Sequence, residues 1–203
     1  SLPARNFQDF MDLLRTTDRP LNYASAGAGT IPHLAAEMLR RTLQVQHSAL
    51  TAGEHHAGAA PAINALVRGQ AQWMFPSLFS ALPYLKSGKV KALAIATPTR
   101  LPEWQDIPTL SEWGLDDFDL TQWYALFAPR GTSPEIVDKI NQTLNEVLND
   151  AEVRARMAQD GAQVKTSTPQ QLSRHVQLEL LRWRKVIAST GLSSDKTAET
   201  AEI

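Results

Sequence analysis

The chain has 203 residues, of which 43% are hydrophobic, and a formal net charge of -1 at pH 7. This length and composition suffice for one large or two small domains with a buried core. The balance of mixed charges argues against a nucleic-acid-binding surface, which requires a basic face. The absence of cysteine excludes disulfides, thiolate zinc sites and cysteine nucleophiles, and no stretch approaches the length of an apolar membrane span.

The first residues predict a helix followed by a short strand. Asn6 is a good N-cap for a helix whose buried side carries Phe7, Phe10 and Leu14. Residues 21–24 then have the character of a short strand. No basic region followed by an apolar run stands at the N-terminus, so a secretory signal is not expected within this sequence.

A loop of small residues joins this strand to the next helix. Residues 25–29 are Ser, Ala, Gly, Ala and Gly, which let the backbone approach a ligand closely. Thr30 suits the N-cap, Pro32 suits the first helical turn, and apolar residues recur at helical spacing from Leu34 to Leu43. Free N–H groups and the positive end of the helix dipole predict an anion site, although tight packing alone also produces such turns.

The chain then alternates strand and helix patterns as far as residue 96. The expected strands are residues 45–50, 70–75 and 90–96, with a loop at 51–58. The expected helices run from Pro61 to Gly69 and from Ser77 to Gly88. The run 90–96 is almost entirely apolar, which is typical of a strand covered on both faces. The alternation predicts a parallel sheet with helical layers on both sides.

From residue 97 onward the pattern changes to proline-rich loops and then to helices. One more strand is expected at 123–129. Helices are expected from Pro134, across Val153 and Met157, and after the capping box Thr168-Pro169-Gln170-Gln171. The expected organisation is an α/β domain over residues 1–122, a hinge strand with C-terminal helices over 123–192, and a flexible tail over 193–203.

Several patterns admit other chemical interpretations. His55 and His56 suggest a metal site, but adjacent strand residues point to opposite faces and no third ligand follows at suitable spacing. Ser25 with a histidine and an acid would form a hydrolase triad, but its neighbours are not the G-x-S-x-G elbow. The five tryptophans lie on different expected elements, which favours packing, and Trp123 lies at the expected domain crossing. The small-residue loop lacks the P-loop and dinucleotide signatures, so a small carboxylate fits it better than a nucleotide.

Short motifs stand in a recognisable order across nearly the whole chain. They are Tyr23 to Thr30 with His33-Leu34, Gly58 to Ala62, Gly69-Gln70, Met74-Phe75, Ser87 to Ala94, Ile107 to Glu112, Gly114-Leu115, Trp123-Tyr124, Phe127 to Pro129, Gly131 to Pro134, Glu179 and Trp183. In this order and register they resemble the substrate-binding proteins of tripartite tricarboxylate transporters, also called Bug receptors.

This resemblance implies a periplasmic receptor with a type II periplasmic-binding-protein-like α/β fold, here one complete domain and the helical C-terminal part of the other. Such receptors clamp a small organic carboxylate on backbone amides at helix N-termini and deliver it to membrane transporter subunits. They have no catalytic residue and no cofactor. The ligand-binding residues implied here are Ser25, Ala26, Gly27, Ala28, Gly29, Thr30, His33, Pro76 and Ser77. His33 would either hydrogen-bond the ligand or orient the loop.

The chain departs from the family pattern in three ways. It begins about a third of the way into the family's length, so the signal peptide and the start of the first domain are expected to be missing. Residues 55–58, His-His-Ala-Gly, stand where the family usually has Pro-Tyr-basic-Gly, and Ala65 and Pro76 occupy places that are commonly aspartate. The alternative to a carboxylate receptor is therefore a truncated relative that forms a homo-oligomeric interaction module. A small-anion enzyme would instead need a base and a nucleophile within hydrogen-bond reach.

Overall fold

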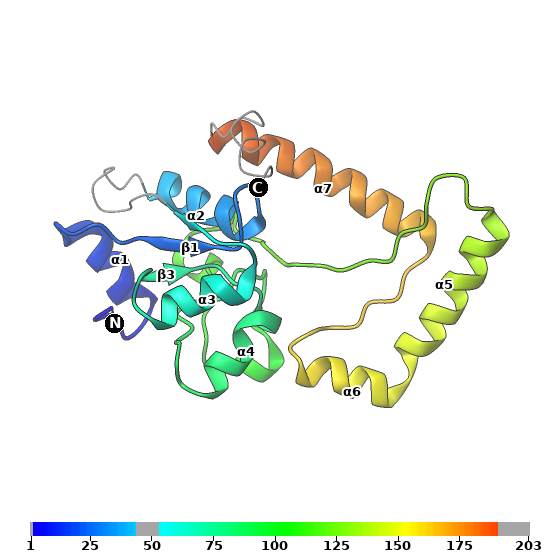
Figure 1. Cartoon of the computed structure of the whole chain (residues 1–203), viewed down its shortest axis with the longest axis horizontal. Helices are drawn as coiled ribbons and strands as arrows, with labels where there is room; N and C mark the ends of the chain where they lie inside the picture. Colours follow the sequence, from blue (N-terminus) through cyan, green and yellow to red (C-terminus); the bar gives the residue numbers. More distant parts are fainter. Residues whose placement is uncertain (1, 44–52, 191–203) are drawn as a thin grey trace. The chain divides into compact units, whose positions relative to one another are not determined.

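The computed structural model describes residues 2–43 and 53–190, and it divides the chain into two compact units (Figure 1). The first unit is Ser1–Gln122 with Ile187–Ile203, and the second is Trp123–Val186. The strand expected at 45–50 and the tail expected from residue 193 lie outside the described residues. In the described part of the chain, no helix combines the length and the apolar character that crossing a membrane requires.

A parallel three-stranded sheet forms the centre of the first unit. Its order is β2 (Glu54–His55), β1 (Tyr23–Ser25) and β3 (Trp73–Met74). All three residues of β1 are buried, because this strand is paired on both edges and covered on both faces. The carboxyl ends of parallel strands lie at the same edge of a sheet, so the loops after β1, β2 and β3 meet there.

Four helices accompany this sheet: α1 (Phe7–Thr16), α2 (Ile31–Thr42), α3 (Ala59–Val67) and α4 (Leu78–Lys86). Alternate residues of a strand point to opposite faces. Ala24 packs in a buried cluster with Ala62 of α3, whereas the hydroxyl of Tyr23 donates to Glu37 of α2 at 3.0 Å. Helices α3 and α2 therefore lie on opposite faces of the sheet, as the strand-helix alternation predicts.

Local capping signals place these helices correctly. Asn6 accepts a hydrogen bond from the Asp9 amide at 2.8 Å, as expected for the N-cap of α1. Ser77 accepts from the Ser80 amide at 3.2 Å and caps α4. Thr30 occupies the N-cap of α2 but its hydroxyl does not cap the helix, because it donates to the Gly27 carbonyl instead.

One loop prediction and one strand prediction for the first unit are wrong. The expected loop at 51–58 contains β2, which is polar and only two residues long, so it carries no strand pattern of its own. The apolar run 90–96 forms no strand, and within the described residues it pairs only through an isolated bridge between Ile95 and Thr109. None of residues 90–96 is fully buried.

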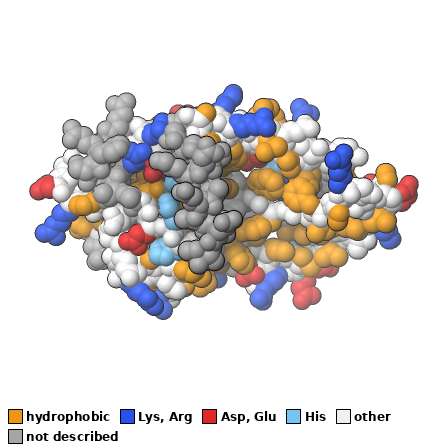
Figure 2. Space-filling model, turned by 45° about the horizontal axis from the view of Figure 1, so that its top comes forward, with side chains coloured by type: hydrophobic (Ala, Val, Ile, Leu, Met, Phe, Trp, Pro, Cys, Tyr) orange, Lys and Arg blue, Asp and Glu red, His pale blue; other side chains and the backbone are white. Residues whose placement is uncertain are grey.

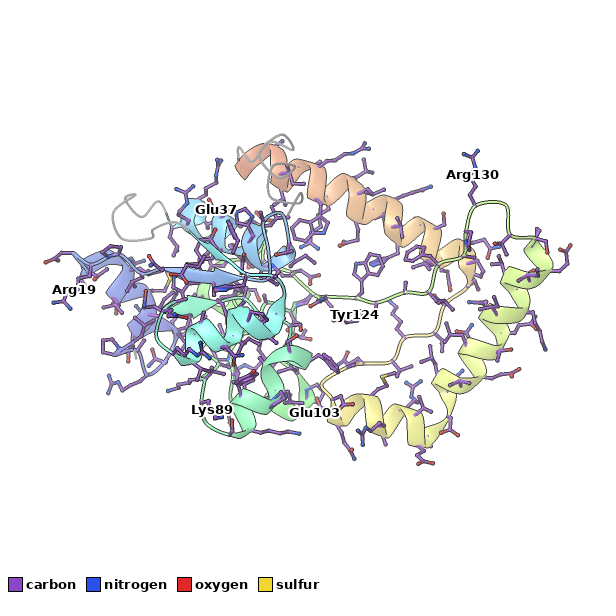
Figure 3. All side chains as sticks on the ribbon, in the orientation of Figure 1. Arg19, Glu37, Lys89, Glu103, Tyr124 and Arg130 are labelled. Atoms are coloured by element: carbon purple, nitrogen blue, oxygen red, sulfur yellow. The ribbon has the colours of Figure 1, made fainter. Side chains whose placement is uncertain are left out.

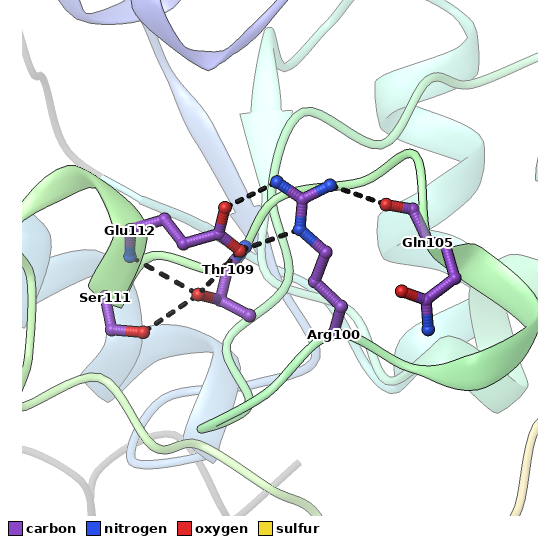
Figure 4. A network of polar contacts seen from close by, with 5 residues as sticks. All are labelled: Arg100, Gln105, Thr109, Ser111 and Glu112. Carbon is purple, nitrogen blue, oxygen red and sulfur yellow. Dashed lines mark hydrogen bonds and ion pairs between the residues drawn. The ribbon is translucent and has the colours of Figure 1, made fainter.

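A polar network holds the loop after this bridge. The guanidinium of Arg100 binds the carboxylate of Glu112, with Nε donating to Oε1 at 2.8 Å, and the same carboxylate accepts from the Thr109 amide at 3.0 Å (Figure 4). Arg100 also donates to the Gln105 carbonyl. These contacts tie together the short 3-10 helices η1 (Pro102–Trp104) and η2 (Ser111–Trp113).

The second unit consists of an extended segment and helices. Helices α5 (Pro134–Asn149), α6 (Ala151–Gln159) and α7 (Pro169–Thr190) begin close to the expected positions. The capping box is confirmed, because the Gln171 amide donates to Thr168 Oγ1 at 3.2 Å and Gln171 Oε1 accepts from the Thr168 amide at 2.9 Å. The strand expected at 123–129 is wrong: this segment pairs with no strand of the described chain.

We expect the substitution Glu112→Gln to lower the free energy of unfolding at pH 7, because Arg100 loses its charged partner. The Arg100 guanidinium, followed by the Thr109 amide, lowers the pKa of Glu112 from 4.5 to about 2. The contribution of the ionised carboxylate is therefore present above pH 4.5 and is lost as the pH falls toward 2. Urea unfolding should show a smaller difference between the two proteins at pH 3 than at pH 7, and a difference independent of pH would contradict this account.

Candidate functional site

The candidate site lies at the carboxyl edge of the sheet, where three loops enter three helices. Residues 26–30 join β1 to α2, residues 56–58 join β2 to α3, and residues 75–77 join β3 to α4. Because β1 is the middle strand, its loop lies between the other two. Ligands of parallel α/β sheets bind at this edge, outside the carboxyl ends of the strands.

The central loop, residues 25–30, is held in shape by its own polar groups. Gly27 has φ 135° and Gly29 has φ 75°, which are backbone conformations that residues other than glycine rarely adopt. The Thr30 hydroxyl donates to the Gly27 carbonyl at 2.7 Å, and the Thr30 amide donates to the same carbonyl at 3.3 Å. The loop is therefore an ordered turn, which the small residues permit.

The amides of this loop fall into two groups. The Gly29 amide donates to Nδ1 of His33 at 2.9 Å, and the Gly27 amide makes a long contact of 3.4 Å to Ser25 Oγ. The amides of Ala26 and Ala28 have no hydrogen-bond partner in the described part of the chain. Ala28 is an exposed residue. Among residues 26–30, these two amides are therefore the ones left without an acceptor within the described structure.

His33 lies in the first turn of α2 and is buried. Its Nδ1 accepts from the Gly29 amide, so the structure displays the loop-orienting contact rather than a free side chain. Burial, and then the neighbouring ring of His55, lower the pKa of His33, while the carboxylate of Glu37 opposes them. A neutral ring with an unprotonated Nδ1 matches its role as an acceptor.

Sequence reasoning did not bring His55 to this site. Ser25 and His55 are register partners in the parallel pair of β1 and β2, so their side chains leave the same face of the sheet. Ser25 Oγ lies 2.7 Å from Nδ1 of His55, and the two imidazole rings of His33 and His55 stand 4.4 Å apart. Without knowing that residues 54–55 form a strand beside β1, no sequence pattern indicates this contact.

The side chain of Glu37, on α2, places a carboxylate near the two histidines. The carboxylate of Glu37 accepts from the Tyr23 hydroxyl at 3.0 Å and pairs with Arg40 at 2.8 Å (Figure 3 labels Glu37). Burial and the nearby Glu37 charge raise the pKa of Tyr23, so its hydroxyl stays protonated and remains a donor. The ring of Tyr23 in turn lies 6.3 Å from that of His33.

The remaining predicted contacts, Pro76 and Ser77, follow β3 at the same edge. The Ser77 hydroxyl is engaged in capping α4 and lies 2.8 Å from the hydroxyl of Ser80. Both residues are half-buried. They therefore border the site through their backbone, with the serine hydroxyl already in use.

The arrangement does not favour hydrolysis. Ser25 is fully buried, so its hydroxyl is not open to attack a substrate. No carboxylate within the described residues hydrogen-bonds to His55, as the orienting acid of a triad would. Over the same residues, no group of three or more metal-binding side chains is gathered in one place.

A parallel α/β sheet with helix N-termini converging on one edge is found in the domains of periplasmic solute-binding proteins, among other α/β folds. The chain belongs to the tripartite tricarboxylate transporter family receptors (TctC), whose family model matches residues 1–192. The family and the type of fold predicted from the sequence motifs are thus confirmed.

Three solved structures match nearly the whole chain. Rpa4515 of R. palustris with adipate superposes with a TM-score of 0.88 at 30% identity, over 95% of this chain and 63% of that one. The periplasmic binding protein BugD superposes with a TM-score of 0.83 at 30% identity, over 95% of this chain and 64% of that one. MatC from Rhodopseudomonas palustris with bound malate superposes with a TM-score of 0.78 at 36% identity, over 91% of this chain and 63% of that one.

The chain spans about half the length of the first curated relatives that it matches. One from Pseudomonas sp. strain P51, named as a UPF0065 protein in the tcbD-tcbE intergenic region, is 30% identical over 196 residues. That alignment covers 94% of this chain and 56% of the relative.

We expect the substitution Gly27→Ala to destabilise the first unit by about 1–3 kcal/mol, because the added Cβ makes a φ of 135° unfavourable. Steric contact is not the reason, since the nearest atom to that Cβ lies 3.5 Å away. Urea unfolding measures the effect. The matched control is Ala28→Gly at the exposed neighbouring position, for which we expect a smaller loss of about 0.4–1 kcal/mol.

Proposed function

We propose that this protein is a periplasmic receptor that binds a small organic carboxylate at the carboxyl edge of its sheet and delivers it to a membrane transporter. The observation that carries this proposal is that, among the residues the structure describes, the amides of Ala26 and Ala28 have no partner, in a loop that enters α2. Two relatives of similar structure hold dicarboxylates, adipate in one and malate in the other.

The chemistry of the loop suits a carboxylate. Its oxygens are acceptors only, and the loop presents N–H donors at the positive end of the α2 dipole. The loop needs little reorganisation to bind, because Gly29 and Thr30 already fix its shape through internal hydrogen bonds. An ordered donor pair loses less entropy on binding than a flexible one.

A receptor of this class would enclose the anion between two domains. Excluding water strengthens each amide–carboxylate hydrogen bond, and the closed form gains population because the ligand binds it better. We expect the part of the relatives that this chain does not match to contribute the opposite wall, since the chain covers 63% of the adipate-bound structure.

We expect the purified chain to release or absorb heat on calorimetric titration with carboxylates, and the substitution Ala28→Pro to weaken this binding. Proline removes the Ala28 N–H, and the loss of one hydrogen bond to a charged group corresponds to roughly a 10- to 100-fold lower affinity. Adipate, malate, succinate, citrate and benzoate form a suitable panel.

Ala28→Gly is the matched control for this experiment, because it keeps the N–H and should retain the affinity within a few-fold. Circular dichroism verifies that both variants fold. Equal affinities of Ala28→Pro and Ala28→Gly would rule out the amide contact, and no heat with any member of the panel would count against the receptor function.

A second candidate function is self-association through the extended segment 123–128. In the described structure its backbone groups make no hydrogen bond, and Tyr124, Leu126 and Phe127 are exposed (Figure 3 labels Tyr124). Hydrophobic side chains are visible on the face of the molecule that Figure 2 presents. A second copy carries the same unpaired segment, and two identical segments can pair antiparallel about a two-fold axis.

For this candidate we expect light scattering to give the mass of a dimer, and Leu126→Asp to shift it to that of a monomer. A buried charge at a strand-strand contact costs more than the pairing contributes. Phe79→Asp, at an exposed phenylalanine of α4, is the control and should leave the mass unchanged. A wild-type chain that stays monomeric at high concentration would exclude this association.

A further inference from the structure

The pair Ser25 and His55 is not used by the amide contacts described above. Both residues end their strands at the carboxyl edge, where the ligand is proposed to bind. The His55 side chain is exposed, and its Nε2 has no hydrogen-bond partner in the part of the chain that the structure describes. The ring is nevertheless fixed in place, because its Nδ1 lies 2.7 Å from the buried Ser25 hydroxyl.

This serine connects His55 directly to the central loop. Ser25 Oγ also lies 3.3 Å from the Gly27 carbonyl and 3.4 Å from the Gly27 amide. In addition, the His56 amide donates to the Ser25 carbonyl at 3.0 Å. The loop that offers the free amides and the ring of His55 are therefore joined by one side chain.

The two histidines of the site are not equivalent. Nδ1 of His33 accepts from the Gly29 amide at 2.9 Å, so a proton cannot be added there without breaking this bond. Nδ1 of His55 faces a hydroxyl, which can donate or accept. Only His55 can gain a proton while its hydrogen bond is kept.

The surroundings of Ser25 satisfy both protonation states of His55. With a neutral ring that carries its hydrogen on Nε2, the serine hydroxyl donates to Nδ1 and accepts from the Gly27 amide. With a protonated ring, Nδ1–H donates to Ser25 Oγ, and the hydroxyl hydrogen turns to the Gly27 carbonyl. In this neutral tautomer and in the protonated ring alike, Nε2 carries a hydrogen that is available to an anion.

The charged and titratable groups around His55 come from three elements. Glu37 and His33 face it from α2, Tyr23 from β1, and His56 follows it in the chain. Burial lowers the pKa of His55, the Glu37 carboxylate raises it, and His56 lowers it. Glu37 is already paired with Arg40 and with the Tyr23 hydroxyl, so His55 has no carboxylate of its own.

We propose that His55 is a specificity-determining ligand contact, whose Nε2–H holds a carboxylate oxygen of the ligand and whose ring takes up a proton from solvent when the anion binds. This inference rests on the carboxylate-binding function proposed above. His55 would select anionic ligands over neutral ones of the same shape, since only a negative charge favours the protonated ring.

The sign of the resulting pH dependence follows from linkage. A bound carboxylate raises the pKa of His55, so the complex binds more protons than the free protein does. Affinity therefore rises as the pH falls from 8 to 6. If the pKa increases by one unit, the gain in affinity is at most about tenfold.

Calorimetry in buffers of different ionisation enthalpy tests this proposal at pH 7, with adipate and malate as probes. The dependence of the observed heat on the buffer gives the number of protons taken up. We expect uptake of a fraction of one proton by the wild-type protein. His55→Gln keeps a neutral N–H donor near Nε2, so it should still bind, without proton uptake and without the rise in affinity at pH 6.

His175→Gln is the matched control, because His175 lies in the second unit against the ring of Trp123. This variant should take up protons like the wild type. Binding without proton uptake, or uptake that persists in His55→Gln, would overturn the role of His55 while leaving the receptor function intact. The absence of binding to either acid would overturn both.

NMR of the wild-type histidine rings gives a readout that does not depend on the folding of a variant. On addition of adipate at constant pH 7, the ring nitrogen shifts of His55 should move toward those of the protonated form. Those of His33 should remain in the neutral form. An unchanged His55 signal in the bound protein would refute the proposal.

Discussion

The pairing of β1 on both of its edges is the constraint on which the rest of the first unit depends. Parallel pairing brings the ends of β2 and β3 to the same edge as Ser25, so three loops that are distant in sequence meet there. The register also decides which side chains meet: Ser25 lies opposite His55, and a shift by one residue would turn the ring to the other face.

The two faces of β1 have different roles: one packs against a helix, and the other carries polar groups of the site. Ala24 faces α3 and is surrounded by other alanines, which lets the helix approach the sheet closely. Tyr23 and Ser25 face the other side, where their hydroxyls meet Glu37 and His55. A strand of three residues thus supplies a close-packed face and a polar face, because its side chains alternate.

What the sequence predicted well is local. The cap at Asn6 and the capping box at Thr168 were correct, because each depends on a side chain and an amide three residues away. The strands at 90–96 and 123–129 were wrong, because a strand requires a neighbour and apolar character alone does not supply one. The predicted ligand contacts included the loop after β1 but omitted His55. The strand that places His55 at the site consists of two polar residues, Glu54 and His55, and such a pair carries no strand pattern. Which loop amides are free was likewise beyond the sequence, because it depends on where His33 and Thr30 direct their side chains.

The extended segment 123–128 has a consequence for how the chain behaves before it meets any partner. Within the described residues its N–H and C=O groups make no hydrogen bond, so they are as open to pairing as a strand edge, and Tyr124 and Phe127 beside them are exposed. Such an edge pairs with other exposed edges as readily as with a correct one, and that competing reaction grows with concentration. Synthesis rate and crowding in the compartment thus become determinants of how much soluble protein accumulates, independently of how tightly the folded first unit holds its ligand.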